Sequence, residues 1–214
     1  MYLFSEKICP VLLRQKRFCG ITIIEKQMAT EIEIKAHVQD SEAIKLILEE
    51  KAKYEGSFEK EDIYWFFDGK PELKPQKLRI RSEKRSLHSG SPELLCFATC
   101  KNKEVIDGIE INEEHEFEVN PRSEFEAFIK QMGFKPGISK KKKGWAFSLG
   151  KINIELSDVE GLGWFVELEI VADNSRPETI AEAKKQLLDF LSGLGIKKEA
   201  IESRYYIDML KELG

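Results

Sequence analysis

The stretch Glu31-Ile32-Glu33-Ile34-Lys35 decides the fold, because it alternates strictly between apolar and fully charged residues. A period of two is typical of a β-strand, whose successive side chains point to opposite faces. An ordinary half-buried strand shows small or mixed polar residues to water, whereas every residue on the second face here carries a full charge. A single strand of this kind would indicate only the solvated face of a sheet.

The same pattern recurs in three later stretches: Lys77-Leu78-Arg79-Ile80-Arg81, Glu114-His115-Glu116-Phe117-Glu118 and Glu167-Leu168-Glu169. Some of these charged faces are wholly acidic and others are wholly basic, which indicates a polar interior that several strands share. Strands separated by turn signals and accompanied by short helices predict an α+β protein, built on an antiparallel barrel or a strongly curled sheet.

Size and composition favour a single soluble domain. The chain has 214 residues, enough to bury a real core. Its net charge is -4 and 34% of its residues are charged, above the usual quarter or so, and the alternating strands account for this excess. No apolar run approaches the length of a membrane span. The four cysteines show neither zinc spacing nor the density of a secreted disulfide framework, so we expect reduced thiols and a cytoplasmic location.

Residues 1–27 differ from the rest of the chain and lack the apolar core and cleavage site of a signal peptide. Met28 stands just before the first charged strand. Two interpretations remain open: Met28 is the biological start, or residues 1–27 are a genuine and weakly ordered extension. We expect one domain over residues 28–214.

The lysine run at 140–143 places a charge on both faces of its strand. If the following hairpin closes at Leu149-Gly150, Lys140 and Lys142 face the interior. A loop longer or shorter by one residue would instead turn the other two lysines inward, since a one-residue slip reverses every side chain. We expect Lys140 and Lys142 to point inward.

The predicted interior combines carboxylates with basic groups. The acids are Glu31, Glu33, Glu114, Glu116, Glu118, Glu155, Glu167 and Glu169, and the bases are Lys35, Arg79, Arg81, Lys101, Lys140 and Lys142. Hard oxygen ligands without histidine or cysteine clusters favour Mg²⁺ or Mn²⁺ over zinc. The basic groups require an anion of high charge density, and the guanidinium groups suit phosphate. A triphosphate held by metal on one side and by cations on the other would satisfy both sets.

These residues also match a known pattern, since Glu31-x-Glu33-x-Lys35 resembles the ExExK signature of the CYTH superfamily, the triphosphate tunnel metalloenzymes. Further stretches resemble this family's motifs in the same order: Asp62-Ile63-Tyr64-Trp65-Phe66, Leu78-Arg79-Ile80-Arg81, Thr99-Cys100-Lys101, Glu114-His115-Glu116, the segment Leu162-Gly163-Trp164-Phe165-Val166-Glu167-Leu168-Glu169, and Arg204-Tyr205-Tyr206-Ile207-Asp208-Met209-Leu210. The resemblance covers residues 28–214.

The resemblance implies a closed eight-stranded antiparallel β-barrel with helices outside, whose tunnel binds a triphosphate with one or two Mg²⁺ or Mn²⁺ ions. By matching position, the catalytic set would be Glu31, Glu33 and Lys35. The metal ligands would be Glu31, Glu33, Glu114, Glu116, Glu167 and Glu169. The phosphate-binding residues would be Lys35, Arg79, Arg81, Lys101, Lys140 and Lys142.

Two positions depart from the family pattern. The arginine that precedes the mid-chain acids by two residues in the family is Asn112 here, and an aspartate position falls on Ser157. The first departure removes one phosphate-facing cation. A network of internal salt bridges that merely fills the barrel is the alternative to a binding site, but such networks give uncertain net stability and are disfavoured for that reason.

Three functions are compatible with these residues. The preferred one is a metal-dependent triphosphatase that hydrolyses inorganic triphosphate, thiamine triphosphate or nucleoside triphosphates. A class IV adenylyl cyclase is the first alternative, but the His-Phe pair that such cyclases often carry falls on Glu25-Lys26 here. A non-catalytic polyphosphate or nucleotide-binding module is the second. We expect a small-molecule triphosphate as the partner, no nucleic acid and no membrane, and we leave a homodimer open.

Overall fold

The computed structural model describes residues 13–18, 21–26, 30–67, 77–87, 91–106 and 109–213. Its strands are β1 (Leu13–Phe18), β2 (Ile21–Lys26), β3 (Thr30–His37), β4 (Lys53–Phe67), β5 (Lys77–Leu87), β6 (Glu93–Ile106), β7 (Ile109–Glu118), β8 (Phe134–Leu149), β9 (Ile152–Val159) and β10 (Gly163–Ala172). Its α-helices are α1 (Ser41–Lys51), α2 (Arg122–Gln131), α3 (Pro177–Gly193) and α4 (Tyr206–Glu212). Within this described part of the chain, no helix is both long and apolar enough to cross a membrane.

Strands β1 and β2 pair with each other in a separate two-stranded sheet. Met28 lies outside the described residues, so the interpretation of the N-terminal segment stays a prediction.

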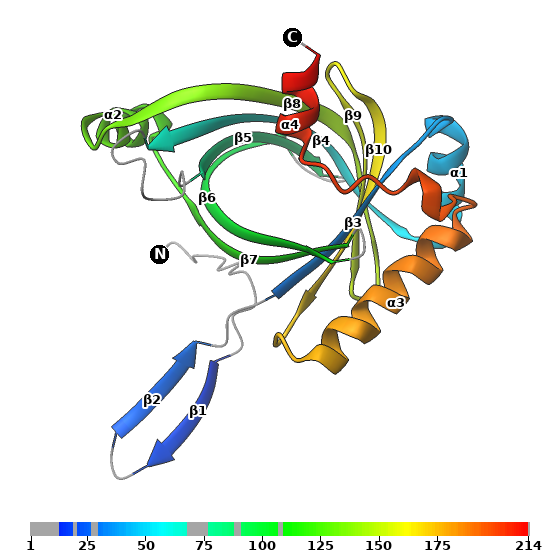
Figure 1. The fold of residues 1–214 in the computed structure, drawn as a ribbon, viewed down its shortest axis with the longest axis horizontal. Coiled ribbons are helices and arrows are strands. Elements are labelled where there is room, and N and C mark those ends of the chain that lie inside the picture. The colour runs from blue at the N-terminus through cyan, green and yellow to red at the C-terminus, as the bar shows by residue number, and fades with distance from the viewer. Residues whose placement is uncertain are drawn as a thin grey trace.

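Strands β3 to β10 form one antiparallel ring in the order β10-β3-β7-β6-β5-β4-β8-β9, and β9 pairs with β10 again (Figure 1). This confirms the expected α+β class and antiparallel pairing. The link between β3 and β7 is short, because only Thr30–Glu33 pairs with Glu110–Glu113. The ring is therefore not closed along the full length of its strands, and the expectation of a regular closed barrel is corrected in this respect.

The main hydrophobic core lies outside the ring, between its strands and two helices. The apolar face of β3, formed by Ile32, Ile34 and Ala36, is completely buried there. Helix α3 contributes Leu187 and Leu191, each almost fully buried, and burying such a side chain stabilises the fold by about 1.5–3 kcal/mol. Figure 1 shows α1 and α3 on the same side of the ring. Burial of the apolar face on this side turns the charged face of β3 toward the interior of the ring.

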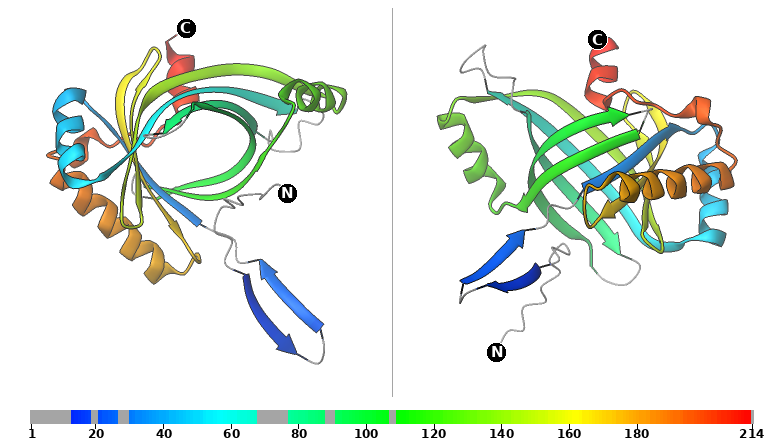
Figure 2. Two further views of the ribbon diagram at one scale, coloured as in Figure 1. Left: turned by 180° about the vertical axis from the view of Figure 1, so that it is seen from behind. Right: turned by 60° about the horizontal axis from the view of Figure 1, so that its bottom comes forward.

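Helix α2 lies on the opposite side of the ring from α1 and α3 (Figure 2). It packs Ile129 against Trp65 of β4 and Ile80 of β5 in a smaller core. The neighbouring Phe128 does not share this packing, since 58% of its surface is exposed.

The C-terminal segment after α3 is not one continuous helix. A short 3₁₀ turn at Lys198–Ala200 is followed by an extended stretch, in which Ile201 forms a β-bridge with Ala36 of β3. Helix α4 begins only at Tyr206. The bridge to β3 joins residues far apart in the sequence, so a local helical pattern could not reveal it. Helix α4 then packs against Val159 and Phe165 at one end of the ring.

Candidate functional site: a charged cavity inside the ring

The interior of the ring holds a cavity of about 380 Å³, lined by the charged faces of the strands. Of the described residues, eight lysines or arginines and eight glutamates line it. The cations are Lys35, Lys60, Arg79, Arg81, Arg85, Lys101, Lys140 and Lys142, and the acids are Glu31, Glu33, Glu110, Glu114, Glu116, Glu155, Glu167 and Glu169. The two sets are therefore formally balanced in charge.

One wall of the cavity carries a group that we call the Glu114 cluster: Glu31, Arg79, Lys101, Glu114 and Glu116. Arg79 Nη2 donates to Glu114 Oε1 at 3.3 Å and to Glu116 Oε2 at 3.2 Å. Lys101 Nζ lies 2.9 Å from Glu31 Oε2 and also pairs with Glu114. All five side chains line the cavity, so each of these ion pairs is open to a ligand inside it.

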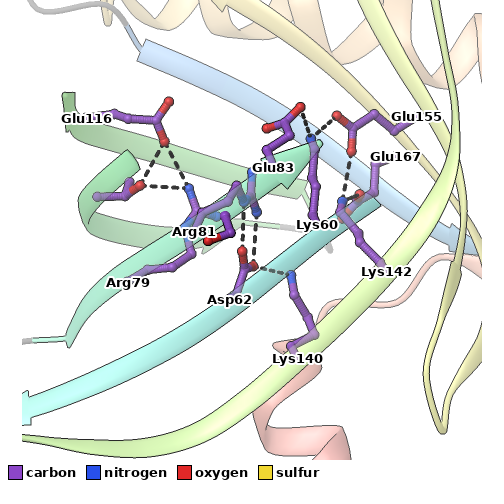
Figure 3. A network of polar contacts seen from close by, with 12 residues as sticks. Lys60, Asp62, Arg79, Arg81, Glu83, Glu116, Lys140, Lys142, Glu155 and Glu167 are labelled. Carbon is purple, nitrogen blue, oxygen red and sulfur yellow. Dashed lines mark hydrogen bonds and ion pairs between the residues drawn. The ribbon is translucent and has the colours of Figure 1, made fainter. Parts of the chain in front are cut away.

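A second group, which we call the Asp62 cluster, consists of Asp62, Arg81 and Lys140 (Figure 3). Arg81 donates to Asp62 through Nε at 2.7 Å and Nη2 at 3.0 Å, and Lys140 Nζ lies 3.0 Å from Asp62 Oδ2. Burial alone would raise the pKa of Asp62, but Arg81 and Lys140 hold it well below its usual range. Burial lowers the pKa of Lys140 to about 8, even though Asp62 opposes that shift.

A chain of ion pairs connects β4, β8, β9 and β10. Glu155 accepts a hydrogen bond from Lys60 and forms an ion pair with Lys142. Lys142 also forms an ion pair with Glu167. Burial opposes ionisation of Glu167, but Lys142 lowers the pKa of that carboxyl to about 2. Burial lowers the pKa of Lys60, and Glu155 only partly offsets this. Burial opposes the charge of Lys142, but Glu155 and Glu167 raise the pKa of this lysine well above its ordinary value, so it stays charged at the edge of the cavity.

Lys35 lies where the C-terminal segment meets the ring. Its Nζ donates to the carbonyl oxygen of Arg204 at 2.6 Å and to Glu110 Oε1 at 3.4 Å. It also lies 4.5 Å from the centre of the Tyr206 ring, a cation–π contact. The backbone of the same segment is tied to β3, since Glu202 N donates to Lys35 O at 2.8 Å. The segment thus fixes the head group of Lys35 at one end of the cavity.

Two carboxylates of the cavity lack a cationic partner at hydrogen-bond distance among the described residues. Burial and then the charges of Glu110 and Glu167 raise the pKa of Glu33 to about 7. Burial and then the charge of Glu31 raise the pKa of Glu169 to about 7. A bound cation would reduce the repulsion between these neighbouring carboxylates and favour their charged form.

The donor set fits a hard divalent cation in its chemistry, since the side chains around Glu33 and Glu169 offer carboxylate oxygens and neither thiolate nor imidazole. Within the described ranges, no three aspartate, glutamate, histidine or cysteine side chains already stand close enough to hold a metal ion. Metal binding would therefore require side-chain rotation. Glu114 and Glu116, expected as metal ligands, both contact Arg79, and their role in metal binding stays a prediction.

The residues that the family resemblance predicted for the site all line this one cavity. Glu118, which the alternating pattern also placed in the interior, is exposed and does not line it. The inward parity of the lysine run is the expected one: Lys140 and Lys142 are buried, whereas the side chain of Lys141 is 57% exposed. Their roles in metal binding, phosphate binding and catalysis stay predictions.

Sequence reasoning missed Lys60, Asp62 and Glu110. Strand β4 starts at Lys53, well before the motif stretch that begins at Asp62. Charges on both parities from Glu59 onwards hid the alternation there. Glu110 has the same parity as Glu114 and Glu116, so extending the pattern of β7 backwards would have found it.

The two positions that depart from the family pattern are both completely buried. The amide oxygen and nitrogen of Asn112 and the hydroxyl of Ser157 find no hydrogen-bond partner among the described protein atoms. Neither residue lines the cavity. Because its side chain is neutral and does not line the cavity, Asn112 supplies no charge to the interior.

Comparisons with known proteins agree with this arrangement. The CYTH domain model matches residues 29–206. An adenylate cyclase candidate from Methanocaldococcus jannaschii is 26% identical over 185 residues, covering 84% of this chain and 97% of that protein. The structure of the PH1012 protein from Pyrococcus horikoshii OT3 is similar with a TM-score of 0.65 and 34% identity, covering 83% of this chain and 98% of that one.

A more distant structure shares the fold. It is a Hippeastrum adenylyl cyclase candidate described as having a dominant triphosphatase activity, with a TM-score of 0.58 and 16% identity, covering 86% of this chain and 96% of that one. The family match spans most of the sequence, and the chain belongs to the CYTH family.

Proposed function

We propose that this protein hydrolyses inorganic triphosphate or a small organic triphosphate, such as thiamine triphosphate or a nucleoside triphosphate, inside the cavity. The observation that supports the proposal most strongly is the number of cations around one small space. Arg79 and Arg81 reach it from β5, and Lys142 reaches it from β8. Phosphoryl transfer depends mainly on positioning and on neutralising charge, which such a cavity can supply.

The charge balance of the cavity favours a substrate that arrives together with a metal ion. A triphosphate alone would add several negative charges to a lining whose cations already have carboxylate partners. Members of the CYTH family generally use divalent metals, and we propose Mg²⁺ or Mn²⁺ here, held by Glu31, Glu33, Glu167 and Glu169. Such an ion, when bound, neutralises phosphate charge and lowers the pKa of a coordinated water.

The protein's own residues would then orient the substrate. Arg79 and Arg81 offer guanidinium donors in the fork geometry that matches phosphate oxygens. Lys101, Lys140 and Lys142 add point charges along the anion. We place the catalytic end at β3, where Glu31, Glu33 and Lys35 share one face, because two acids there can hold the metal beside the lysine.

Adenylyl cyclase activity is the second candidate, because the Methanocaldococcus relative is named for it. Product analysis separates the two reactions. Purified protein is incubated with Mg²⁺ or Mn²⁺ and, separately, with inorganic triphosphate, thiamine triphosphate and ATP. Orthophosphate release without cyclic AMP supports the triphosphatase. Cyclic AMP with pyrophosphate from ATP would establish the cyclase instead, and no turnover of any of the three would leave a binding module.

A further inference from the structure

Asp62 occupies a position that the proposed reaction does not use directly. It lies on β4 between two neighbouring strands, directly opposite Arg81 of β5 and Lys140 of β8 in the pairing register. Both of its carboxylate oxygens are engaged, one by Arg81 alone and the other by Arg81 and Lys140. The register of three strands therefore builds this contact.

Asp62 differs from the glutamates of the cavity because it is buried behind the lining rather than part of it. Its side chain is completely buried and does not line the cavity, whereas Arg81 and Lys140 both do. The short aspartate side chain thus lies behind the two cations rather than beside the ligand space (Figure 3). From this position it contacts the head groups that reach the cavity without contacting a molecule bound inside it.

Stability alone gives little reason for such a cluster. A buried ion network is often no more stable than well-packed apolar residues of similar volume. The arrangement does, however, fix the orientation of a forked guanidinium and a lysine at the surface of an anion-binding cavity. One carboxylate against two cations also leaves a net positive charge at that surface.

We propose that Asp62 is a positioning residue, which holds Arg81 and Lys140 in the orientation in which they bind a triphosphate. This inference rests on the proposed function, because it needs a triphosphate in the cavity.

The charges around Lys140 make its pKa depend on Asp62. The charged or titratable groups that act on it are Asp62 from β4, Arg81 from β5, Lys142 from β8, Glu167 from β10, and the Tyr206 ring of α4 at 4.9 Å. Asp62 makes the largest contribution that keeps Lys140 protonated, against burial, Lys142 and Arg81. Without the carboxylate, Lys140 should therefore lose its proton at a lower pH.

The test measures binding of inorganic triphosphate by calorimetry, without metal, from pH 6 to pH 9. In Asp62→Asn, we expect affinity to fall by roughly tenfold or more at pH 7, as for the loss of a charged hydrogen-bonding group. The decline of affinity with rising pH should also begin at a lower pH than in the wild type. The matched control is Glu61→Gln, since Glu61 is the preceding residue on β4 and its side chain is 45% exposed. This control should bind as the wild type does.

A second variant keeps the test decisive if Asp62→Asn does not fold. Lys140→Arg retains a positive charge across this pH range, since arginine stays protonated. It should bind triphosphate at neutral pH and lose less affinity than the wild type as the pH rises toward 9. An unchanged affinity and pH profile in folded Asp62→Asn, or an unchanged profile in Lys140→Arg, would overturn the positioning role. A wild-type protein that neither binds triphosphate without metal nor hydrolyses it with Mg²⁺ would instead overturn the proposed function, and the positioning role with it. If the wild type acts on triphosphate only with Mg²⁺, the same variants are compared by the KM for triphosphate, with the same expected directions.

Discussion

The Asp62 cluster and the Glu114 cluster pair acids with cations in the same cavity, but they differ in whether the acid can reach a ligand. In the Asp62 cluster the carboxylate is fully buried behind its two cations. In the Glu114 cluster the carboxylates line the cavity beside Arg79 and Lys101. The difference indicates two kinds of counter-ion: a fixed one that orients cations, and an exchangeable one that a phosphate could displace.

The largest expected effect is the loss of activity when the Glu114 cluster is altered. Arg79→Ala should lower the rate of triphosphate hydrolysis by about a hundredfold or more, because it removes a donor from the anion-binding wall. The fold should remain, since the carboxylates left behind face the cavity and can be hydrated. Steady-state kinetics together with circular dichroism check this. Wild-type turnover in folded Arg79→Ala would exclude the Glu114 cluster from the site.

The free energy of unfolding should depend more on the Asp62 cluster than on the Glu114 cluster. Asp62→Ala leaves Arg81 and Lys140 without their shared carboxylate, and removing one partner of a buried ion pair costs about 3–5 kcal/mol. Glu114→Ala should cost only about 1 kcal/mol or less, because Arg79 and Lys101 keep Glu116 and Glu31 as alternative partners. Urea unfolding of both variants makes the comparison. Equal losses would mean that the two counter-ions do not differ as we infer.

Ligand binding without metal should sharpen the contrast further. Glu114→Gln removes a carboxylate that competes for Arg79 and Lys101, so inorganic triphosphate should bind roughly threefold to tenfold more tightly than in the wild type. Asp62→Asn is expected to weaken the same binding. Calorimetric titration of both variants tests the pair of directions, and weaker binding in Glu114→Gln would contradict an exchangeable role for that residue.

The smallest effect concerns acid stability. Arg81 and Lys140 depress the pKa of Asp62 in the folded state, below the value of about 3.9 in an unfolded chain. This contribution is therefore present above about pH 4 and is lost as the pH falls through the folded pKa. The free energy of unfolding of Asp62→Asn should accordingly depend less on pH below about 4 than that of the wild type. If the free energy of unfolding falls with decreasing pH equally steeply in the two proteins, protonation of this carboxylate is not linked to folding.

The sequence allowed the lining of the cavity to be predicted where a strand has one charged face and one apolar face. Glu33 on β3 and Arg79 on β5 follow from such alternation, since burial of the other face leaves them a single direction. Asp62 did not follow, because charges on both parities of β4 leave its inward face undefined. The anchoring of Lys35 by the Arg204 carbonyl depends on a contact across 169 positions, which local patterns do not encode.

We claim that the cations inside the ring bind and process a triphosphate. The most direct test measures orthophosphate release from inorganic triphosphate with Mg²⁺ by the wild type, Lys142→Ala and Lys141→Ala. Neighbouring lysines make a matched pair, since Lys142 is buried at the cavity and the side chain of Lys141 is 57% exposed. We predict that the wild type and Lys141→Ala release orthophosphate at similar rates and that folded Lys142→Ala loses most of the activity. Equal rates in all three proteins, or no release by the wild type, would contradict the claim.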